Sequence, residues 1–280
     1  MSKRRDLERR IHGLGEIKEI MNAMKNLALM ETHKLTRFLA TQHRVVEDIR
    51  AAAEDFLSFH AQFFSENKIT RDVFLLIGSE RGFCGDFNDA MRRYLNGHSP
   101  GIGAPALIVV GSKLSSKLAD DRRVVMQVEG PATLEEVQPV LRKLVEALGH
   151  WQAMQAAPCL LRLTVFHNQP GDAGVKTTLL NPFTHWAAQK PRPGHAPLLN
   201  LDPRVFLTQL ADHYLFATLH EIFYSSLMAE NQRRIQHMDS AVRRIEQKSS
   251  EFQRKRNSLH QEEITEEIEV IMLNAEMMRT

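Results

Sequence analysis

The chain has 280 residues, of which 43% are hydrophobic and 25% are charged, and this composition is typical of a folded protein rather than a disordered one. Its net charge is only +2 with histidine neutral, which is too small to indicate nucleic-acid binding. No apolar run approaches the ~20 residues that span a bilayer, and no apolar core follows the basic N-terminal residues as in a signal peptide. We therefore expect a protein that is neither secreted nor membrane-embedded, although it could attach to a membrane complex.

The first ten residues are locally basic. Two interpretations remain open: the cations belong to a solvated first turn, or they form a patch that docks an acidic partner. The residues concerned are Lys3, Arg4, Arg5, Arg9 and Arg10.

The two cysteines, Cys84 and Cys159, are far apart in the sequence and show no CxxC or Cys/His spacing. Such cysteines are typical of a reducing compartment, where thiols stay free. We therefore predict two reduced thiols in a cytosolic protein.

Glycine and proline, which most often interrupt regular structure, are unevenly distributed along the chain. After Gly15 neither occurs until Gly78, and after Pro203 neither occurs up to Thr280, whereas both are frequent between these limits. The chain therefore has two helix-permissive ends and a loop-rich middle. We predict three segments: a coiled-coil helix at 1–66, an α/β globular domain at 67–202, and a second coiled-coil helix at 203–280 that pairs with the first.

In the first segment, apolar residues recur at alternating spacings of three and four, as in the seam of two paired helices. Glu31 and Gln42 interrupt this pattern, and one polar seam residue can fix the register of a helix pair. About 45 helical residues at ~1.5 Å each would make a helix of roughly 65 Å. The predicted seam consists of Leu14, Ile17, Met21, Met24, Ala28, Leu35, Phe38, Gln42, Val45, Ile49, Ala52 and Phe56.

The last segment predicts a longer helix. Asp202 is a suitable N-cap and Pro203 a suitable first helical residue, and about 75 residues from there to Met278 correspond to roughly 110 Å. Two apolar stripes fall out of phase near Glu262, which predicts a stutter in the winding. The first stripe comprises Ile235, Met238, Val242, Ile245, Ser249, Phe252, Arg256 and Leu259, and the second comprises Ile264, Ile268, Ile271, Ala275 and Met278.

Neither helix has enough apolar surface to be stable alone in water. The simplest partner of each helix is the other, and the compact middle can return the chain so that the two run antiparallel. The second helix is longer by about 30 residues, or ~45 Å, so part of it must extend past the pair. Its apolar end suggests insertion into an apolar sleeve of another protein, with a frayed or self-associating tail as the alternative.

The middle alternates short apolar runs, typical of buried strands, with helical patterns. Two helices are predicted at Asp86–Asn96 and Leu134–Leu148, although Pro139 complicates the second. Ser112 can cap a further helix. This alternation predicts a Rossmann-like α/β domain with a mainly parallel sheet covered by helices. The predicted strands are Val73–Ile77, Ala106–Val110, Val124–Val128, Leu160–Phe166 and Val175–Leu180.

Residues 78–85, GSERGFCG, lie between a predicted strand and a predicted helix, where a phosphate-binding loop would be found. They match neither GxGxxG nor GxxxxGK[ST], so we favour a turn whose glycines allow a tight passage from strand to helix. Cys84 has no histidine or aspartate at a spacing that marks a nucleophile, and His213 and His220 lack the glutamate of a metalloprotease helix. We predict no catalytic residue, no metal site and no cofactor.

Segments near both ends and in the middle of the chain follow the motifs of one protein family. Arg10–Ile11 and residues 20–28 (IMNAMKNLA) are similar to the stretch R-I…I-T-x-A-M-x-M-V-A, and residues 79–88 (SERGFCGDFN) are similar to the loop S-D-R-G-L-C-G-G-L-N. The C-terminal signatures E-x-x-x-R…A-M-D-x-A and N-x-x-x-Q-x-x-I-T-x-E-I are matched by Glu230, Arg234, Met238, Asp239, Ala241, Asn257, Gln261, Ile264, Thr265, Glu267 and Ile268. The chain thus resembles the gamma subunit of rotary F-type ATP synthases.

The resemblance implies a central-stalk rotor subunit. Its coiled coil would lie inside a ring of three alpha and three beta subunits, and its globular part would stand on the membrane c-ring with the epsilon subunit. Rotation of the asymmetric shaft would couple ion flow to ATP synthesis or hydrolysis, so the chain itself is not an enzyme and binds no nucleic acid. We expect a peripheral membrane protein on the cytoplasmic face of the bacterial inner membrane.

The resemblance also implies which residues meet partners. Met24 and Lys25 would face a beta subunit, and Asn257 and Gln261 would contact the beta catch region. The residues of an apolar bearing near the tip would be Ile264, Ile268 and Ile271. The globular-domain loop is marked by Arg81, Gly82, Cys84 and Gly85.

The sequence also departs from the family pattern at several positions. Asp86 and Asn274 replace glycines, His260 replaces an arginine and Ile17 replaces a threonine, which fits a divergent or sodium-linked branch. The transported ion, proton or sodium, is selected by the c-ring and not by this chain. The main alternative is a coiled-coil scaffold or tether with a partner-binding α/β domain, and a more distant one is a nucleotide-dependent enzyme with helical arms.

Overall fold

The computed structural model describes residues 2–60, 69–97, 105–154, 160–171, 174–180 and 198–277. These residues belong to two compact units, one formed by residues 28–234 and the other by residues 1–27 together with 235–280. The segment boundaries at 66/67 and 202/203 stay a prediction, and Cys159 and Met278 lie outside the described residues.

Two very long helices form the ends of the chain, as predicted. Helix α1 is Ser2–His60, with 59 residues, and helix α5 is Pro203–Met277, with 75 residues. At the start of α5 the N–H of Arg204 donates to Asp202 Oδ1 at 2.9 Å, so Asp202 is the predicted N-cap. Pro203 follows in the first turn, where its missing N–H costs no hydrogen bond.

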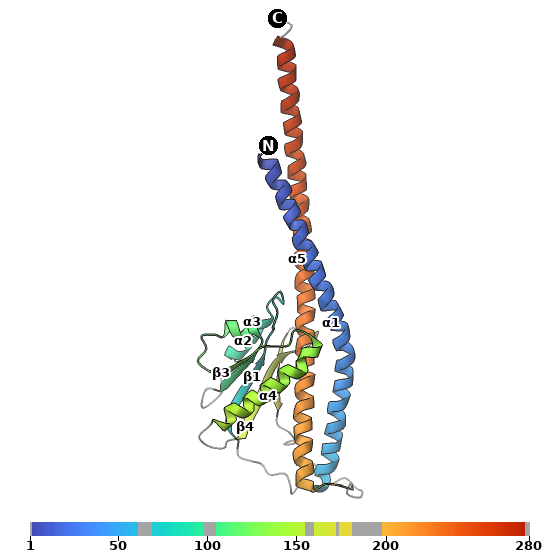
Figure 1. Ribbon diagram of the computed structural model, residues 1–280, viewed down its shortest axis with the longest axis vertical. Helices are drawn as coiled ribbons and strands as arrows, with labels where there is room; N and C mark the ends of the chain where they lie inside the picture. The colour runs from blue at the N-terminus through green and yellow to red at the C-terminus, as the bar shows by residue number, and fades with distance from the viewer. Residues whose placement is uncertain are drawn as a thin grey trace. The chain divides into compact units, whose positions relative to one another are not determined.

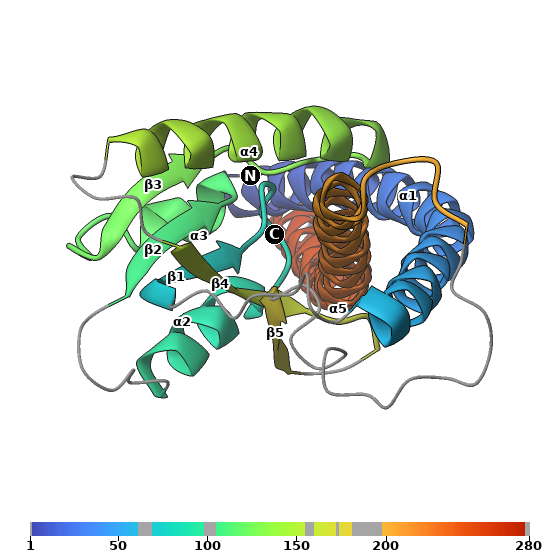
Figure 2. The ribbon, with the colours of Figure 1, turned by 90° about the horizontal axis from the view of Figure 1, so that it is seen from below.

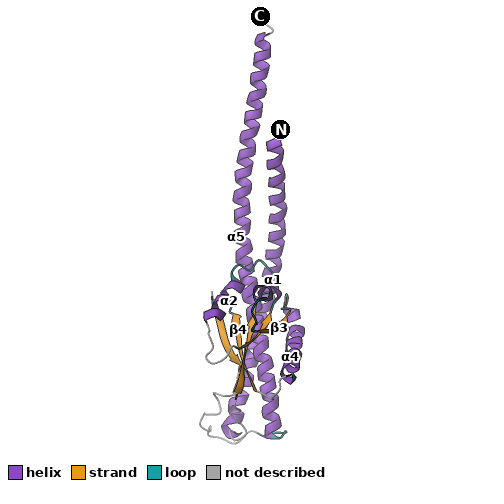
Figure 3. Ribbon diagram, turned by 90° about the vertical axis from the view of Figure 1, so that its left-hand side faces the viewer, coloured by secondary structure: helices purple, strands orange, loops and turns teal. Residues whose placement is uncertain are grey.

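In the unit formed by residues 1–27 and 235–280, α1 and α5 lie side by side and run in opposite directions (Figures 1 and 3). Helix α5 continues past the beginning of α1. Met238 is fully buried and Val242 is 6% exposed, and the whole predicted stripe from Ile235 to Leu259 is buried or half-buried. The first α5 stripe is therefore confirmed.

The predicted seam of α1 is correct at eight of its twelve positions, including Ala28 and Leu35, which are buried or half-buried. The other four are exposed, and at each of them the buried or half-buried residue is the next one in the chain. The exposed residues are Ile17, Phe38, Val45 and Ala52, and the residues that follow them are Lys18, Leu39, Val46 and Ala53. The sequence pattern favoured isoleucine over Lys18, whereas a lysine can bury its aliphatic stem and keep its ammonium in an ion pair.

The middle of the chain forms one five-stranded sheet in the order β3-β2-β1-β4-β5. Strands β1 to β4 pair in parallel, and β5 pairs antiparallel with β4, which confirms the mainly parallel sheet. The strands are β1 Ile69–Ile77, β2 Ala106–Val110, β3 Val124–Val128, β4 Leu160–Asn168 and β5 Val175–Leu180. The connecting helices are α2 Phe87–Gly97, α3 Ser112–Lys117, the 3-10 turn η2 Leu134–Glu136 and α4 Val137–Ala153.

The sheet has a helical layer on each face (Figure 2). Because side chains alternate along a strand, Val73 and Leu75 of β1 join one cluster while Leu76 joins the other. The first cluster includes α4, Leu35 of α1 and Phe223 of α5, and the second includes α2 and α3. The long helices are thus part of the core of the unit formed by residues 28–234.

One local expectation changes in detail: the predicted helix Leu134–Leu148 is the turn η2 followed by α4. Pro139 lies in the first turn of α4, where proline is tolerated because the first N–H groups of a helix have no partner within it.

In the described part of the chain, no helix combines the length and apolar character needed to cross a bilayer.

Candidate functional site

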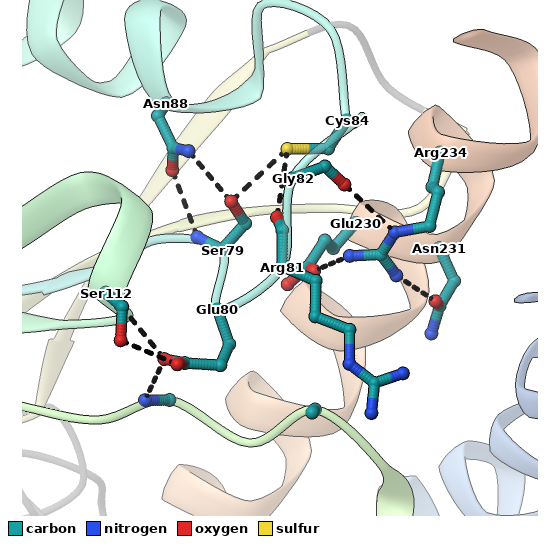
Figure 4. Close-up of polar contacts among 12 residues, drawn as sticks. Ser79, Glu80, Arg81, Gly82, Cys84, Asn88, Ser112, Glu230, Asn231 and Arg234 are labelled. Atoms are coloured by element: carbon teal, nitrogen blue, oxygen red, sulfur yellow. Dashed lines mark hydrogen bonds and ion pairs between the residues drawn. The ribbon is translucent and has the colours of Figure 1, made fainter. Parts of the chain in front are cut away.

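The loop of residues 79–86 leaves the carboxyl end of β1 and is held by a buried polar network (Figure 4). The N–H of Ser79 donates to Asn88 Oδ1 at 3.0 Å, and Asn88 Nδ2 donates to Ser79 Oγ at 2.8 Å. Cys84 Sγ donates to the same hydroxyl at 3.2 Å. Burial raises the pKa of the Cys84 thiol, so Cys84 acts here as a protonated donor rather than as a thiolate.

Glu80 joins this loop to the ends of the two neighbouring strands. Its Oε2 accepts the N–H of Ser112 at 2.9 Å and that of Gly130 at 2.7 Å, and its Oε1 accepts Ser112 Oγ at 2.6 Å. Burial alone would raise the pKa of Glu80, but these hydrogen bonds outweigh it and lower the pKa. Ser112 is therefore not the predicted cap of α3; it is the first helical residue, and a carboxylate distant in sequence caps it.

Glycines give this end of the sheet its close packing. A Cβ on Gly78 would lie 2.2 Å from Leu114 Cβ, and Gly111 has a φ of 106°. Gly85 has a φ of 61°, which few other residues adopt without strain. The prediction of a glycine turn for a tight passage from strand to helix is therefore confirmed.

Arg234 of α5 reaches the same loop from the other side (Figure 4). Its Nε donates to the carbonyl oxygen of Gly82 at 3.2 Å, its Nη1 donates to Asn231 Oδ1 at 2.6 Å, and its Nη2 pairs with Glu230 Oε1. The side chains of Arg234 and Glu230 are 5% and 4% exposed. The guanidinium thus has partners on three nitrogens in a place that water does not reach.

Glu230 completes the contact, since its carboxylate also accepts the backbone N–H groups of Arg81 and Glu80. Burial raises the pKa of Glu230 to about 7, and Arg234 opposes this rise. Sequence reasoning used Glu230 and Arg234 only as family matches and did not consider Asn231. The sequence did contain a signal for this contact, namely a group of polar residues in the part of α5 that packs on the sheet and is buried there.

Ion pairs hold α1 and α5 together in the unit of residues 1–27 and 235–280. Lys25 Nζ lies 3.2 Å from Asp239 Oδ1, Lys18 Nζ lies 2.7 Å from Glu246 Oε1 and Arg4 Nε lies 3.3 Å from Glu263 Oε2. Lys25 is therefore part of the helix pair, next to the half-buried Met24.

The predicted residues near the tip are exposed in this chain. Asn257 and Gln261 are on the surface of α5, and Ile264, Ile268 and Ile271 are 43%, 52% and 67% exposed. Since Arg4 is already paired with Glu263, these isoleucines follow the last inter-helix ion pair of the described residues.

The predicted residues fall in two places rather than one. The helix residues belong to the unit of residues 1–27 and 235–280, whereas the loop residues Arg81, Gly82, Cys84 and Gly85 belong to the unit of residues 28–234. In the loop, Arg81 and Gly85 are exposed, Gly82 is half-buried and Cys84 is buried.

These features define a class of protein in which two long terminal helices pair antiparallel and an α/β domain is inserted between them in the sequence. The sequence model described as ATP synthase matches residues 3–278. The chain belongs to this family, and within it to the gamma chains.

Similar proteins agree with this assignment. The ATP synthase gamma chain of Clostridium botulinum (strain Langeland) is 22% identical over 283 residues, covering 98% of this chain and 97% of its own length. That of Desulforamulus reducens is 22% identical over 281 residues, covering 97% and 98%.

Two solved structures share the fold. A chain in the cryo-EM structure of Euglena gracilis mitochondrial ATP synthase, OSCP/F1/c-ring, has a TM-score of 0.65 at 17% identity and covers 99% of this chain and 95% of its own. A chain in the Tetrahymena thermophila central stalk/c-ring structure has a TM-score of 0.53 at 19% identity, covering 79% and 99%.

Proposed function

We propose that the chain is the central-stalk rotor subunit of an F-type ATP synthase, coupling ion flow through the membrane c-ring to ATP synthesis or hydrolysis in the catalytic head. The observation that carries this proposal is the antiparallel pair of α1 and α5, in which α5 continues past the pair with exposed apolar residues. A contiguous group of exposed apolar residues is typical of a surface that a partner covers.

The catalytic head, made of alpha and beta subunits, would bind the helix pair. Met24 and Lys25 would face a moving beta subunit, and Asn257 and Gln261 would meet its catch region. Ile264, Ile268 and Ile271 would fill an apolar bearing. Each orientation of the asymmetric shaft would stabilise one beta conformation over the others, so the coupling is a difference in contact free energy.

The globular part would meet the epsilon subunit and the c-ring. The chain would then be a peripheral protein at the cytoplasmic face of the bacterial inner membrane. Nucleotide chemistry would belong to the partners, and the chain would act as a non-catalytic subunit. The Glu80 carboxylate supports this, because it accepts the N–H groups of Ser112 and Gly130, which are therefore already bonded and not available to an anionic ligand.

Co-purification tests the proposal. The tagged chain should bring down alpha and beta subunits at one copy to three of each, and adding it to an alpha–beta mixture should change the ATPase rate. A scaffold or tether would leave that rate unchanged, and this result would refute the rotor function.

A truncation tests the bearing. Removing the residues from Ile264 onward should weaken assembly or lower ion-driven ATP synthesis, since the exposed isoleucines would be lost. The matched variant, Val270→Ala in the full chain, keeps Ile264, Ile268 and Ile271 and should retain activity. Unchanged synthesis by the truncated chain would contradict the bearing role.

A further inference from the structure

One turn of α5, residues 230–234, bonds the carboxyl ends of two adjacent strands. Arg234 and Glu230 bond backbone groups of the loop that follows β1. Gln232 Oε1 accepts the N–H of Gly171, which follows β4, at 3.0 Å. Since the partners are backbone groups, the contacts fix where the sheet sits against the helix whatever side chains the loops carry.

The 230–234 turn lies next to the point where the strand order of the sheet reverses. Strands β2 and β3 follow β1 on one of its edges, and β4 lies on the opposite edge of β1. The strand order therefore reverses between β1 and β4. In open α/β sheets the crevice at this point usually receives a ligand. Here Arg234 and Glu230 from α5 contact the loop that leaves it. Arg234 is also the last residue of the unit formed by residues 28–234.

The directional bonds of this turn add to the apolar packing of α5 on the sheet. Leu219, Phe223 and Leu227 of α5 pack against the sheet in the main cluster, and because protein interiors are close-packed, these contacts resist displacement as well. Charge-assisted hydrogen bonds are directional, and they are stronger where water is excluded. The 230–234 turn therefore holds α5 against displacement along the sheet edge.

We propose that the 230–234 turn is the link through which the α/β domain and α5 transmit torque to each other, with Arg234 as its central positioning residue. This inference rests on the proposed rotor function and extends it to a specific place in the chain. A tangential force on the domain reaches α5 through the guanidinium and the loop backbone, at the position where α5 leaves the unit.

The test uses the complete complex containing the full-length chain. We compare Arg234→Ala with Arg244→Ala, which changes an exposed arginine of α5 outside the 230–234 turn. With Arg234→Ala, ion-driven ATP synthesis should fall at least fivefold while ATP hydrolysis stays within twofold. The catalytic head can still hydrolyse ATP when the α/β domain no longer transmits torque to α5. Added methylguanidine should restore part of the synthesis. Arg244→Ala should leave both rates unchanged.

Each other outcome overturns the inference. Equal loss of synthesis and hydrolysis would indicate a purely structural role, and unchanged synthesis would show that the turn carries no torque. If Arg234→Ala fails to fold, Gln232→Ala and Arg234→Lys give the same comparison, because each removes some of the directional bonds and keeps the rest. Failure of the unaltered chain to co-purify with the head would instead refute the rotor function itself.

Discussion

Lys25 and Asp239 lie opposite each other on the two paired helices, with Lys25 Nζ 3.2 Å from Asp239 Oδ1. The hydrogen bond from Lys25, together with the charge of Arg243, lowers the pKa of the Asp239 carboxyl. Lys18 and Glu246 repeat the arrangement seven residues away on each helix. Cations on α1 therefore face anions on α5, which favours one antiparallel register over its neighbours.

Reversing this charge pair should show its role in the register. Lys25→Glu places a second carboxylate beside Asp239 and should lower the midpoint of thermal unfolding. Adding Asp239→Lys restores an attractive pair and should recover part of the loss, because the new lysine also lies beside the Arg243 cation. Circular dichroism of the four members of the cycle measures this. Arg9→Glu, at an exposed position on α1, is the control, and an equal shift in the control would contradict a specific pairing.

Adjacent valines test which face of α1 is buried. Val46 is 2% exposed and Val45 is 41% exposed. Val46→Ala should lower the free energy of unfolding by about 1–2 kcal/mol through lost burial and a residual cavity. Val45→Ala should change it by less than about 0.5 kcal/mol. Chemical denaturation measures both, and equal effects would contradict the seam described above.

The buried His167 should make a contribution to stability that is lost in acid. Burial lowers its pKa to about 4 from the ordinary value of 6.5. As pH falls from 6.5 to 4, the unfolded chain therefore binds a proton at this histidine that the folded chain does not bind. A shift of this size corresponds to a loss on the order of 3 kcal/mol over that window. In His167→Gln only the opposite effect of Glu230, described next, remains, so unfolding at several pH values should show stability falling as pH rises from 4.5 to 6.5. His150→Gln, at an exposed site on α4, should keep the profile of the natural chain.

Glu230 should have the opposite effect over nearly the same range. Burial raises its pKa to about 7 from 4.5, so the folded chain binds the extra proton and stability falls as pH rises from 4.5 to 7. The contributions of Glu230 and His167 therefore largely cancel in the natural chain. In Glu230→Gln the opposing contribution is gone, and stability should rise with pH across this window. A flat profile in that variant would contradict the assignment.

Two glycines should respond to alanine in opposite directions. Gly111 has a φ of 106°, and a Cβ there would lie 2.7 Å from the carbonyl oxygen of Gly78. Gly111→Ala should therefore cost more than about 2 kcal/mol from strain and collision. Gly149 is inside α4 with nothing within 4 Å of an added Cβ. Gly149→Ala should add about 0.5–1 kcal/mol through helix propensity. Denaturation midpoints measure both changes.

Much of the fold could be predicted from local pattern. The absence of glycine and proline after Pro203 predicted α5, and Asp202 predicted its first turn. The strands at 106–110, 124–128 and 175–180 agree with the structure residue by residue, because β-branched and aliphatic runs between turns have few other stable arrangements.

The sequence could not decide between positions that are adjacent on a helix. Ile17 and Lys18 fit the same spacing, and only the partner helix shows that Lys18 faces Glu246 while Ile17 is exposed. The cap of α3 could not be predicted for the same reason. Ser112 is a residue type that often caps helices, but Glu80, 32 residues away in the sequence, accepts its N–H instead.

The helices, the strands and the family follow from local pattern alone, because they depend on spacings of a few residues and on motifs that lie together in the chain. Which side of α1 is buried, and that Glu230 and Arg234 hold the loop after β1, became known from the folded structure. These outcomes depend on the free energy of burying particular groups against partners distant in sequence, and that energy exists only once the chain has folded.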